Sequence, residues 1–174
     1  MAGLLDGPGG LRKLAFWTER GNAMAIIVEP GDPRAPEIRA LIEESAAQMA
    51  RLFPAEHNHH LGVDALRGPD IRFFVAREYD TTLGCAALAQ RQGYGEVKAM
   101  FTAPFARGQG VARRLLERIE LEARHLDMPC LRLETGDALR EAIALYESAG
   151  FARRGPFGDY EENGSSVFME KPLH

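Results

Sequence analysis

Apolar residues along the chain recur with two different periods, one typical of helices and one typical of strands. Over residues 36–53 they are spaced by three and four positions, which predicts an amphipathic helix. Its apolar face consists of Ile38, Leu41, Ile42, Met49 and Leu52. The same spacing returns over about 112–126 and about 138–149, and Gly150 is suited to end the last helix. We therefore expect three helices.

Short runs rich in apolar and β-branched residues predict strands between and after these helices. The predicted strands are 24–29, 71–78, 83–91, 95–103, 130–135 and two near the end, around 151–155 and 165–173. Short polar turns join the strands within 71–103, so we expect an antiparallel meander there. The strand at 130–135 follows a helix, which implies a parallel crossover. The order predicts one mixed α/β domain over 24–174.

Composition is that of an ordinary soluble globular protein. The 174 residues are 45% hydrophobic and 26% charged, enough for one core. A formal net charge of −4 argues against a nucleic-acid-binding surface. No apolar run reaches the roughly 20 residues that a membrane helix needs, so we expect neither a nucleic acid nor a membrane as partner. Residues 1–23 lack the pattern of a signal peptide and are expected to be a flexible leader.

The cysteines and histidines give little sign of special chemistry. Cys85 and Cys130 lie in apolar strand-like runs and are expected to be small buried hydrophobic residues. Two cysteines do not form a disulfide framework, so a reducing cytoplasmic location fits best. The segment 56–60, EHNHH, has neither the H-E-x-x-H motif nor the helical spacing of a zinc site. We expect no metal and interpret the segment as a polar loop.

The stretch 103–119, APFARGQGVARRLLERI, places glycines and arginines directly before the clearest helix of the chain. A helix start exposes unpaired N–H groups with partial positive charge, and glycines let an anion approach them closely. A strand, this turn and a helix therefore form a candidate phosphate site, to which Arg107 and Arg113 add charge. No lysine follows Gly110, as a P-loop requires, and Arg113 breaks the dinucleotide fingerprint G-x-G-x-x-G.

Three segments together resemble the GNAT superfamily of acyl-CoA N-acyltransferases. The loop matches R/Q-x-x-G-x-G/A through Arg107, Gly110 and Ala112, and it follows the strand VKAMFTAP. The later segment LYESAGF lies at the family's distance from this loop. The resemblance covers about 25–172 and implies a GNAT-like fold, a mostly antiparallel central sheet with a parallel central pair and flanking helices.

The resemblance also implies acetyl-CoA as co-substrate, because main-chain amides of this loop bind the diphosphate of coenzyme A in the family. The loop residues carried over are Arg107, Gly108, Gln109, Gly110, Val111, Ala112 and Arg113. Met100, Phe101 and Thr102 of the preceding strand would pair with the pantetheine arm, and one of their N–H groups would polarise the thioester carbonyl. Many relatives have an asparagine seven residues before the tyrosine, where this chain has Leu139 and lacks that contact.

Two catalytic residues are carried over in the same way. Tyr146 matches the tyrosine that protonates the departing thiolate, and a phenol stays protonated at neutral pH; the alternative is that it only packs in the core. Glu96 matches a glutamate that helps remove the amine proton, usually through water; the alternative is a surface carboxylate at the start of a strand. Glu134 is the competing candidate, because a carboxylate in an apolar strand is unfavourable unless it is paired.

We therefore expect an acetyl-CoA-dependent N-acetyltransferase that acts on a primary amine of a small molecule by direct attack in a ternary complex. A protein or peptide acceptor and a non-catalytic acyl-CoA-binding module are the alternatives. Acceptor selectivity is expected in loops 53–70 and 155–165, with Asp159 and Tyr160 facing the 56–60 segment. Relatives often dimerise, so a homodimer is one expectation.

Overall fold

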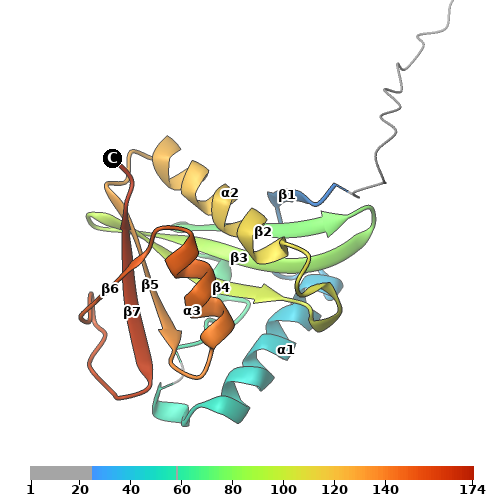
Figure 1. Cartoon of the computed structure of the whole chain (residues 1–174). Helices are drawn as coiled ribbons and strands as arrows, with labels where there is room; N and C mark the ends of the chain where they lie inside the picture. Colours follow the sequence, from blue (N-terminus) through green and yellow to red (C-terminus); the bar gives the residue numbers. More distant parts are fainter. Residues whose placement is uncertain (1–24, 58) are drawn as a thin grey trace, which may run out of the picture.

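The computed structural model describes residues 25–57 and 59–174, and the predicted leader over 1–23 lies outside them (Figure 1). The strands are β1 (Ile27–Pro30), β2 (Ile71–Glu78), β3 (Thr81–Arg91), β4 (Tyr94–Thr102), β5 (Cys130–Gly136), β6 (Ala152–Arg154) and β7 (Ser166–Pro172). The α-helices are α1 (Pro36–Leu52), α2 (Val111–His125) and α3 (Arg140–Ser148). Single 3₁₀ turns occur at Ala55–His57, Ala65–Arg67 and Pro104–Ala106.

The strands form one sheet in the order β1-β2-β3-β4-β5-β7-β6. Every neighbouring pair is antiparallel except β4 and β5, which are parallel because α2 carries the chain back across the sheet. The predicted mixed α/β fold, with its meander and its parallel central pair, is confirmed. Strand β1 begins later than predicted, because its pairing with β2 starts at Ile27 opposite Arg77.

The parallel pair separates soon after it forms. Strands β4 and β5 pair only at Gly95 with Leu131 and at Glu96 with Arg132. Beyond that point β4 follows β3, whereas β5 follows β7 as far as Gly136. The register between β3 and β4 also shifts opposite Ala99, whose φ of 50° marks a bulge. A bulge increases the local twist, and the two central strands end with a gap between them.

Helices α1 and α2 cover opposite faces of the sheet (Figure 1). The guanidinium of Arg118 in α2 lies 4.5 Å from the ring centre of Phe74 in β2. The next residue, Val75, points to the other face and meets Ile38 of α1 beside Gly31. Five apolar residues of α2 are buried on its face: Val111, Leu115, Leu116, Ile119 and Ala123. The core therefore lies on both sides of β2, β3 and β4.

The last apolar residues of α1 lie outside the core. Ile38, Leu41 and Ile42 are buried, as predicted. Met49 is half-buried and Leu52 is 44% exposed, and both line a cavity at the open end of the β4–β5 gap. The periodic pattern thus predicts the helix correctly, but its last apolar positions belong to a cavity wall.

One of the two cysteines departs from the prediction. Cys85 is buried, and burial raises the pKa of its thiol to about 12. Cys130 is only half-buried, because it opens β5 at the rim of the sheet, where its Sγ is 3.9 Å from Glu170. In the part of the chain that the structure describes, no helix is both long and apolar enough to cross a membrane.

Candidate active site

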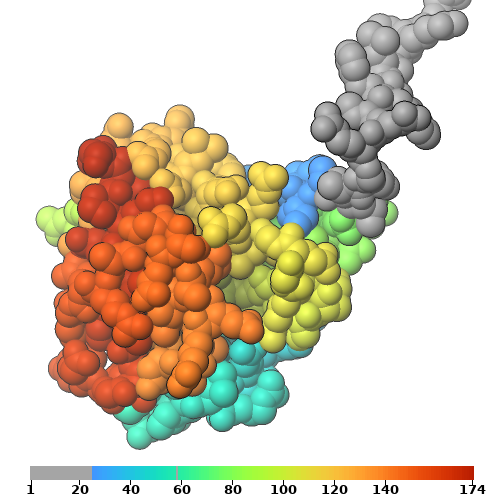
Figure 2. All heavy atoms as spheres, viewed as in Figure 1, coloured from blue at the N-terminus to red at the C-terminus, as the bar shows by residue number. Residues whose placement is uncertain are grey.

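A cavity of about 810 Å³ occupies the gap between β4 and β5. Figure 2 shows the hollow between α3, drawn in orange, and the loop before α2, drawn in yellow, with α1 in cyan below. Predicted site residues that line it are Met100, Phe101, Thr102, Arg107, Gly108, Gly110, Val111, Ala112, Arg113 and Tyr146. Segments predicted separately along the chain therefore meet at one place. Gln109 and Glu96 do not line the cavity.

The loop before α2 presents free main-chain donors. Gly108 and Gly110 have φ values of 74° and 83°, a region that favours glycine, and α2 starts directly after Gly110 without a side-chain cap. Among the described residues, no acceptor takes a hydrogen bond from the N–H groups of residues 108–113. These donors and the positive end of the helix can therefore receive an anion.

Two arginines add full positive charge on either side of this loop. The Arg107 Nη2 atom donates to Gln48 Oε1 of α1 at 3.1 Å. On the other side, Arg113 Nη2 donates to Ser148 Oγ of α3 at 2.8 Å. Neither arginine forms an ion pair with a described residue, so their charges remain available to a ligand. The mouth of the cavity is thus positively charged although the whole chain is acidic.

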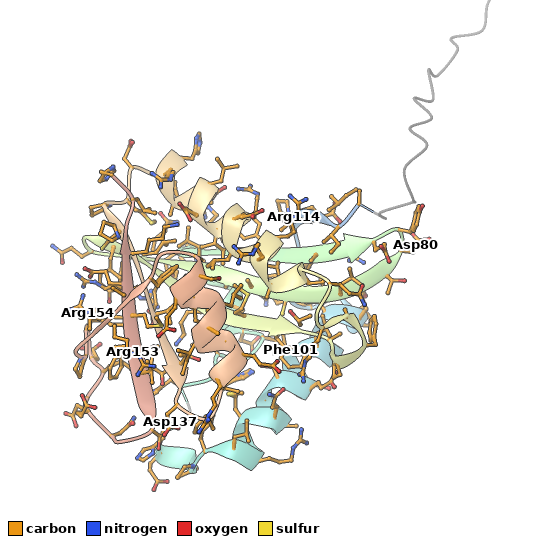
Figure 3. The ribbon with its side chains drawn as sticks, in the orientation of Figure 1. Asp80, Phe101, Arg114, Asp137, Arg153 and Arg154 are labelled. Atoms are coloured by element: carbon orange, nitrogen blue, oxygen red, sulfur yellow. The ribbon has the colours of Figure 1, made fainter. Side chains whose placement is uncertain are left out.

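The end of β4 is the second donor surface. Met100, Phe101 and Thr102 line the cavity on the side of β4 that has no strand partner beyond Glu96; Phe101 is labelled in Figure 3. The hydroxyl of Thr102 is buried and has no hydrogen-bond partner among the described residues. Buried polar atoms are almost always paired, so Thr102 Oγ1 is a group with which a water or a ligand in the gap can pair. An extended ligand can bind the free edge as a strand would.

Tyr146 lies where α3 meets the gap. Its side chain is 5% exposed, lines the cavity and packs against Phe151 with ring centres 5.8 Å apart. Burial raises the pKa of Tyr146, and the negative charge of Glu134 raises it further. The phenol therefore stays protonated at neutral pH and can donate. Tyr146 thus packs in the core and also lines the cavity, and its predicted role as proton donor stays a prediction.

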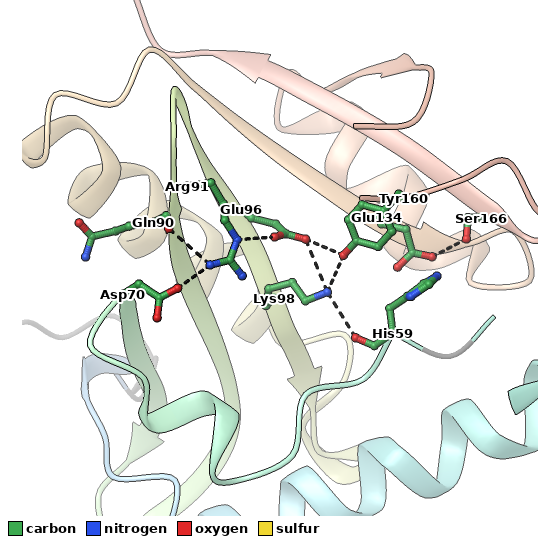
Figure 4. A network of polar contacts seen from close by, with 9 residues as sticks. All are labelled: His59, Asp70, Gln90, Arg91, Glu96, Lys98, Glu134, Tyr160 and Ser166. Carbon is green, nitrogen blue, oxygen red and sulfur yellow. Dashed lines mark hydrogen bonds and ion pairs between the residues drawn. The ribbon is translucent and has the colours of Figure 1, made fainter. Parts of the chain in front are cut away.

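Glu96 is enclosed in a polar network (Figure 4). It is 4% exposed, and its Oε1 accepts a hydrogen bond from the Tyr160 hydroxyl at 2.6 Å. Lys98 Nζ lies 3.5 Å from the same oxygen, and Arg91 Nε donates to Oε2 at 3.3 Å. Glu96 is therefore neither a surface carboxylate nor open to the cavity, and its predicted role as base stays a prediction.

The same network joins two segments that are far apart in sequence. Lys98 Nζ donates to Tyr160 Oη at 2.7 Å and to the main-chain oxygen of His59 at 3.3 Å. The rings of His59 and Tyr160 also meet edge-on, with centres 4.9 Å apart. Burial, followed by the hydrogen bond to Glu96, raises the pKa of Tyr160. Tyr160 thus faces the histidine segment, while Asp159 is exposed to solvent.

Glu134 and the start of β7 form the polar wall on the other side of the gap. Glu134 lines the cavity, and its Oε1 accepts a hydrogen bond from Ser166 Oγ at 2.6 Å. His57 Nδ1 and Ser165 Oγ are 3.1 Å apart, which closes the cavity between α1 and the β6–β7 loop. Nothing in the local sequence marks Lys98 or Ser166 as site residues, because their contacts join distant segments.

The histidine segment forms part of the wall of the cavity. His57, His59 and His60 all line the cavity, and His60 Nε2 is 3.2 Å from the main-chain oxygen of Ile42. Burial, followed by the positive charge of Lys98, lowers the pKa of His60. Within residues 25–57 and 59–174, no three His, Cys, Asp or Glu side chains are arranged to hold a metal ion.

Known proteins match this chain over most of its length. A family model described as "Acetyltransferase (GNAT) family" matches residues 38–151. An IAA acetyltransferase of Azospirillum brasilense is 52% identical over 150 residues, which cover 85% of this chain and 98% of that protein. YsnE of Bacillus subtilis, an uncharacterized N-acetyltransferase, is 40% identical over 140 residues, covering 79% and 93%.

A solved structure agrees with these relatives. It is described as that of "the putative acyl-CoA N-acyltransferase from Klebsiella pneumoniae", which is 34% identical and has a TM-score of 0.73, covering 88% of this chain and 100% of that one. The match of sequence and fold extends across the loop, the gap and α3. The chain therefore belongs to the acetyltransferase (GNAT) family and is an acetyltransferase.

Proposed function

We propose that this acetyltransferase moves the acetyl group of acetyl-CoA to a primary amine of a small molecule by direct attack in a ternary complex. The observation that carries the proposal is the single cavity through the β4–β5 gap. Free main-chain donors of residues 108–113 lie at one end of it, and Tyr146 and Glu134 lie along its walls. A donor and an acceptor can therefore meet inside the sheet.

The donor end suits the coenzyme. The amides of residues 108–113 would bind the diphosphate, with Arg107 and Arg113 as flanking charges. The free edge formed by Met100, Phe101 and Thr102 would pair with the amide groups of the pantetheine arm. A main-chain N–H of this edge would also stabilise the negative charge that develops on the thioester oxygen.

The reaction needs one new bond, one broken bond and two proton movements. The amine nitrogen bonds to the thioester carbon, and the carbon–sulfur bond breaks. An alkylammonium has a pKa of about 10 and gives up two protons on becoming an amide, one of which ends on sulfur and the other in solvent. Tyr146 would give its proton to the departing thiolate and regain one from the acceptor side. A carboxylate, Glu96 or Glu134, would receive the proton from nitrogen.

The closed acceptor end supports a small acceptor. The contact between His57 and Ser165 and the network of Lys98 with Tyr160 and His59 join the covering segments over the cavity. A peptide would have to displace these contacts to reach the gap. The Azospirillum brasilense relative is named for IAA, so IAA belongs among the acceptors to be tested.

The test is release of free thiol from acetyl-CoA by the purified chain with a panel of small amines, IAA and peptides. We expect turnover with at least one small primary amine and an acetylated product of the matching mass. Turnover restricted to peptides would contradict the acceptor class. Failure to bind any acyl-CoA in calorimetry would contradict the whole proposal.

A further inference from the structure

We infer that Glu134 accepts the amine proton, that Ser166 and Asn163 position it, and that Glu96 is an anchor for the acceptor segments. The inference rests on the proposed function and deepens it, since the sequence leaves two carboxylates as candidates. A base must offer a free lone pair to the reacting nitrogen, directly or through one water. The two carboxylates differ in this respect.

Glu134 has such a lone pair. Its side chain lines the cavity, and only its Oε1 is occupied, by the hydroxyl of Ser166. Its other oxygen has neither a hydrogen-bond partner nor an ion-pair partner among the described residues. Glu134 and Tyr146 both line the cavity, and the negative charge of Glu134 contributes to the raised pKa of Tyr146. Glu134 can therefore take a proton in the cavity that Tyr146 also lines.

Two residues before and at the start of β7 hold Glu134 in place. Asn163 Nδ2 donates to Ser166 Oγ at 3.0 Å, and this hydroxyl in turn donates to Glu134 Oε1 at 2.6 Å. Asn163 is itself fixed, because its Oδ1 accepts hydrogen bonds from the main-chain N–H groups of Ser165 and Ser166 at 3.0 and 2.9 Å. Because the Ser166 hydroxyl accepts from Asn163, its single hydrogen is directed at Glu134, and this hydrogen bond orients the carboxylate toward the cavity.

Glu96 offers no comparable atom. Its Oε1 is taken by Tyr160 and Lys98, its Oε2 is taken by Arg91, and its side chain does not line the cavity. Removing one member of a buried charged network leaves the others unpaired, which is strongly unfavourable. Glu96 therefore fixes Lys98 and Tyr160, and through them His59, around the acceptor.

Other titratable groups around the cavity also affect how kcat depends on pH. They are Tyr146, Arg140 and Glu141 on α3, Lys98 on β4, Arg107 and Arg113 around the loop before α2, Tyr160 on the β6–β7 loop, and His57, His59 and His60. The tyrosines have raised pKa values and stay neutral, while His60 has a lowered one. The pH profile of a Glu134 variant therefore separates the role of this carboxylate from that of the other groups.

The experiment compares Glu134→Gln, Glu96→Gln and Ser166→Ala with the wild type over pH 4–10, a range that includes the ordinary pKa of glutamic acid, about 4.3, using an acceptor found in the thiol-release screen. Glu134→Gln should lower kcat by about 100-fold or more at pH 7, within the usual range for a general base. It should lose the acid limb of the kcat profile and regain rate as the free amine increases, with unchanged affinity for acetyl-CoA. Glu162→Gln, which changes an exposed carboxylate of the β6–β7 loop, is the control.

The other two variants separate positioning from catalysis. Ser166→Ala should lower kcat by about tenfold and shift the acid limb, and Ser166→Thr should restore both. Glu96→Gln should mainly raise KM for the acceptor and keep the acid limb. Wild-type kcat in Glu134→Gln, or loss of the acid limb in Glu96→Gln, would overturn this inference alone. A wild-type chain that binds acetyl-CoA but acetylates nothing would overturn the proposed function as well.

Discussion

The two ends of the cavity are built in different ways. The donor end, residues 100–102 and 107–113, consists of consecutive main-chain groups at the end of β4 and the start of α2. The acceptor end is built from side chains whose partners are far apart, such as Lys98 with His59, 39 positions away, and His57 with Ser165, 108 positions away. Under the proposed function, consecutive main-chain groups would bind the coenzyme that all such reactions share. Long-range side-chain contacts would shape the part of the cavity that selects the acceptor.

The largest effect should come from Tyr146→Phe, which removes the proposed proton donor from the wall of the cavity. We expect kcat to fall by about 100-fold, because general acids typically contribute 10²–10⁴-fold. The ring still packs against Phe151, so stability and affinity for acetyl-CoA should be retained. Steady-state kinetics measure kcat, and calorimetry measures the affinity for acetyl-CoA and the stability. Tyr94→Phe, which removes a hydroxyl outside the cavity wall, should leave kcat unchanged.

The second largest effect should come from Gly136→Ala, which crowds Phe53 in the cavity wall. A Cβ at this position would lie 1.9 Å from Cζ of Phe53, so the ring must move. Overpacking of this kind typically costs about 1–3 kcal/mol in the free energy of unfolding. Denaturant unfolding measures the loss, and Phe53→Leu in the same chain should recover part of it. Equal stability of Gly136→Ala and the wild type would show that the Phe53 ring can move aside without loss of stability.

The donor loop should respond to Gly110→Ala by losing affinity for coenzyme A. Gly110 has a φ of 83°, and a left-handed conformation costs a residue with a Cβ about 1–2 kcal/mol. The loop would relax and move its amides, which should weaken coenzyme binding by about tenfold. Gly93 has the same φ in a hairpin turn, and no atom lies within 4 Å of a Cβ added at either glycine. Gly93→Ala should therefore cost similar stability with unchanged affinity; equal affinities in both variants would count against the loop as the binding site.

The smallest effect concerns pH and the acceptor end. The pKa of His60 is lowered in the folded chain, so the unfolded chain binds the proton more readily. This contribution to stability is therefore fully present at neutral pH and is lost as pH falls below about 6.5, the ordinary pKa of histidine. His60→Gln should flatten the fall in Tm between pH 7 and pH 5. An unchanged slope would mean that other groups cause the acid sensitivity.

The sequence predicts where residues 107–113 lie in the fold, but it does not predict the side-chain contacts on the other side of the cavity. The periods of α1 and α2, the glycines before α2 and the crossover to β5 are local, so the fold and the place of residues 107–113 could be predicted. The environment of Glu96 could not, because Tyr160 and Arg91 reach it from other segments. Met49 and Leu52 have the same period as core residues, and only the separation of β4 and β5 makes them cavity wall. Cys130 is half-buried for a similar reason, since its place at the rim depends on the sheet order.

The most direct measurement is a crystal structure of this chain with coenzyme A. The account predicts the diphosphate within hydrogen-bonding distance, about 3 Å, of the main-chain nitrogens of residues 108–113. It also predicts the thiol in the β4–β5 gap beside Tyr146. A coenzyme bound elsewhere, or one whose diphosphate leaves these amides unused, would contradict the account.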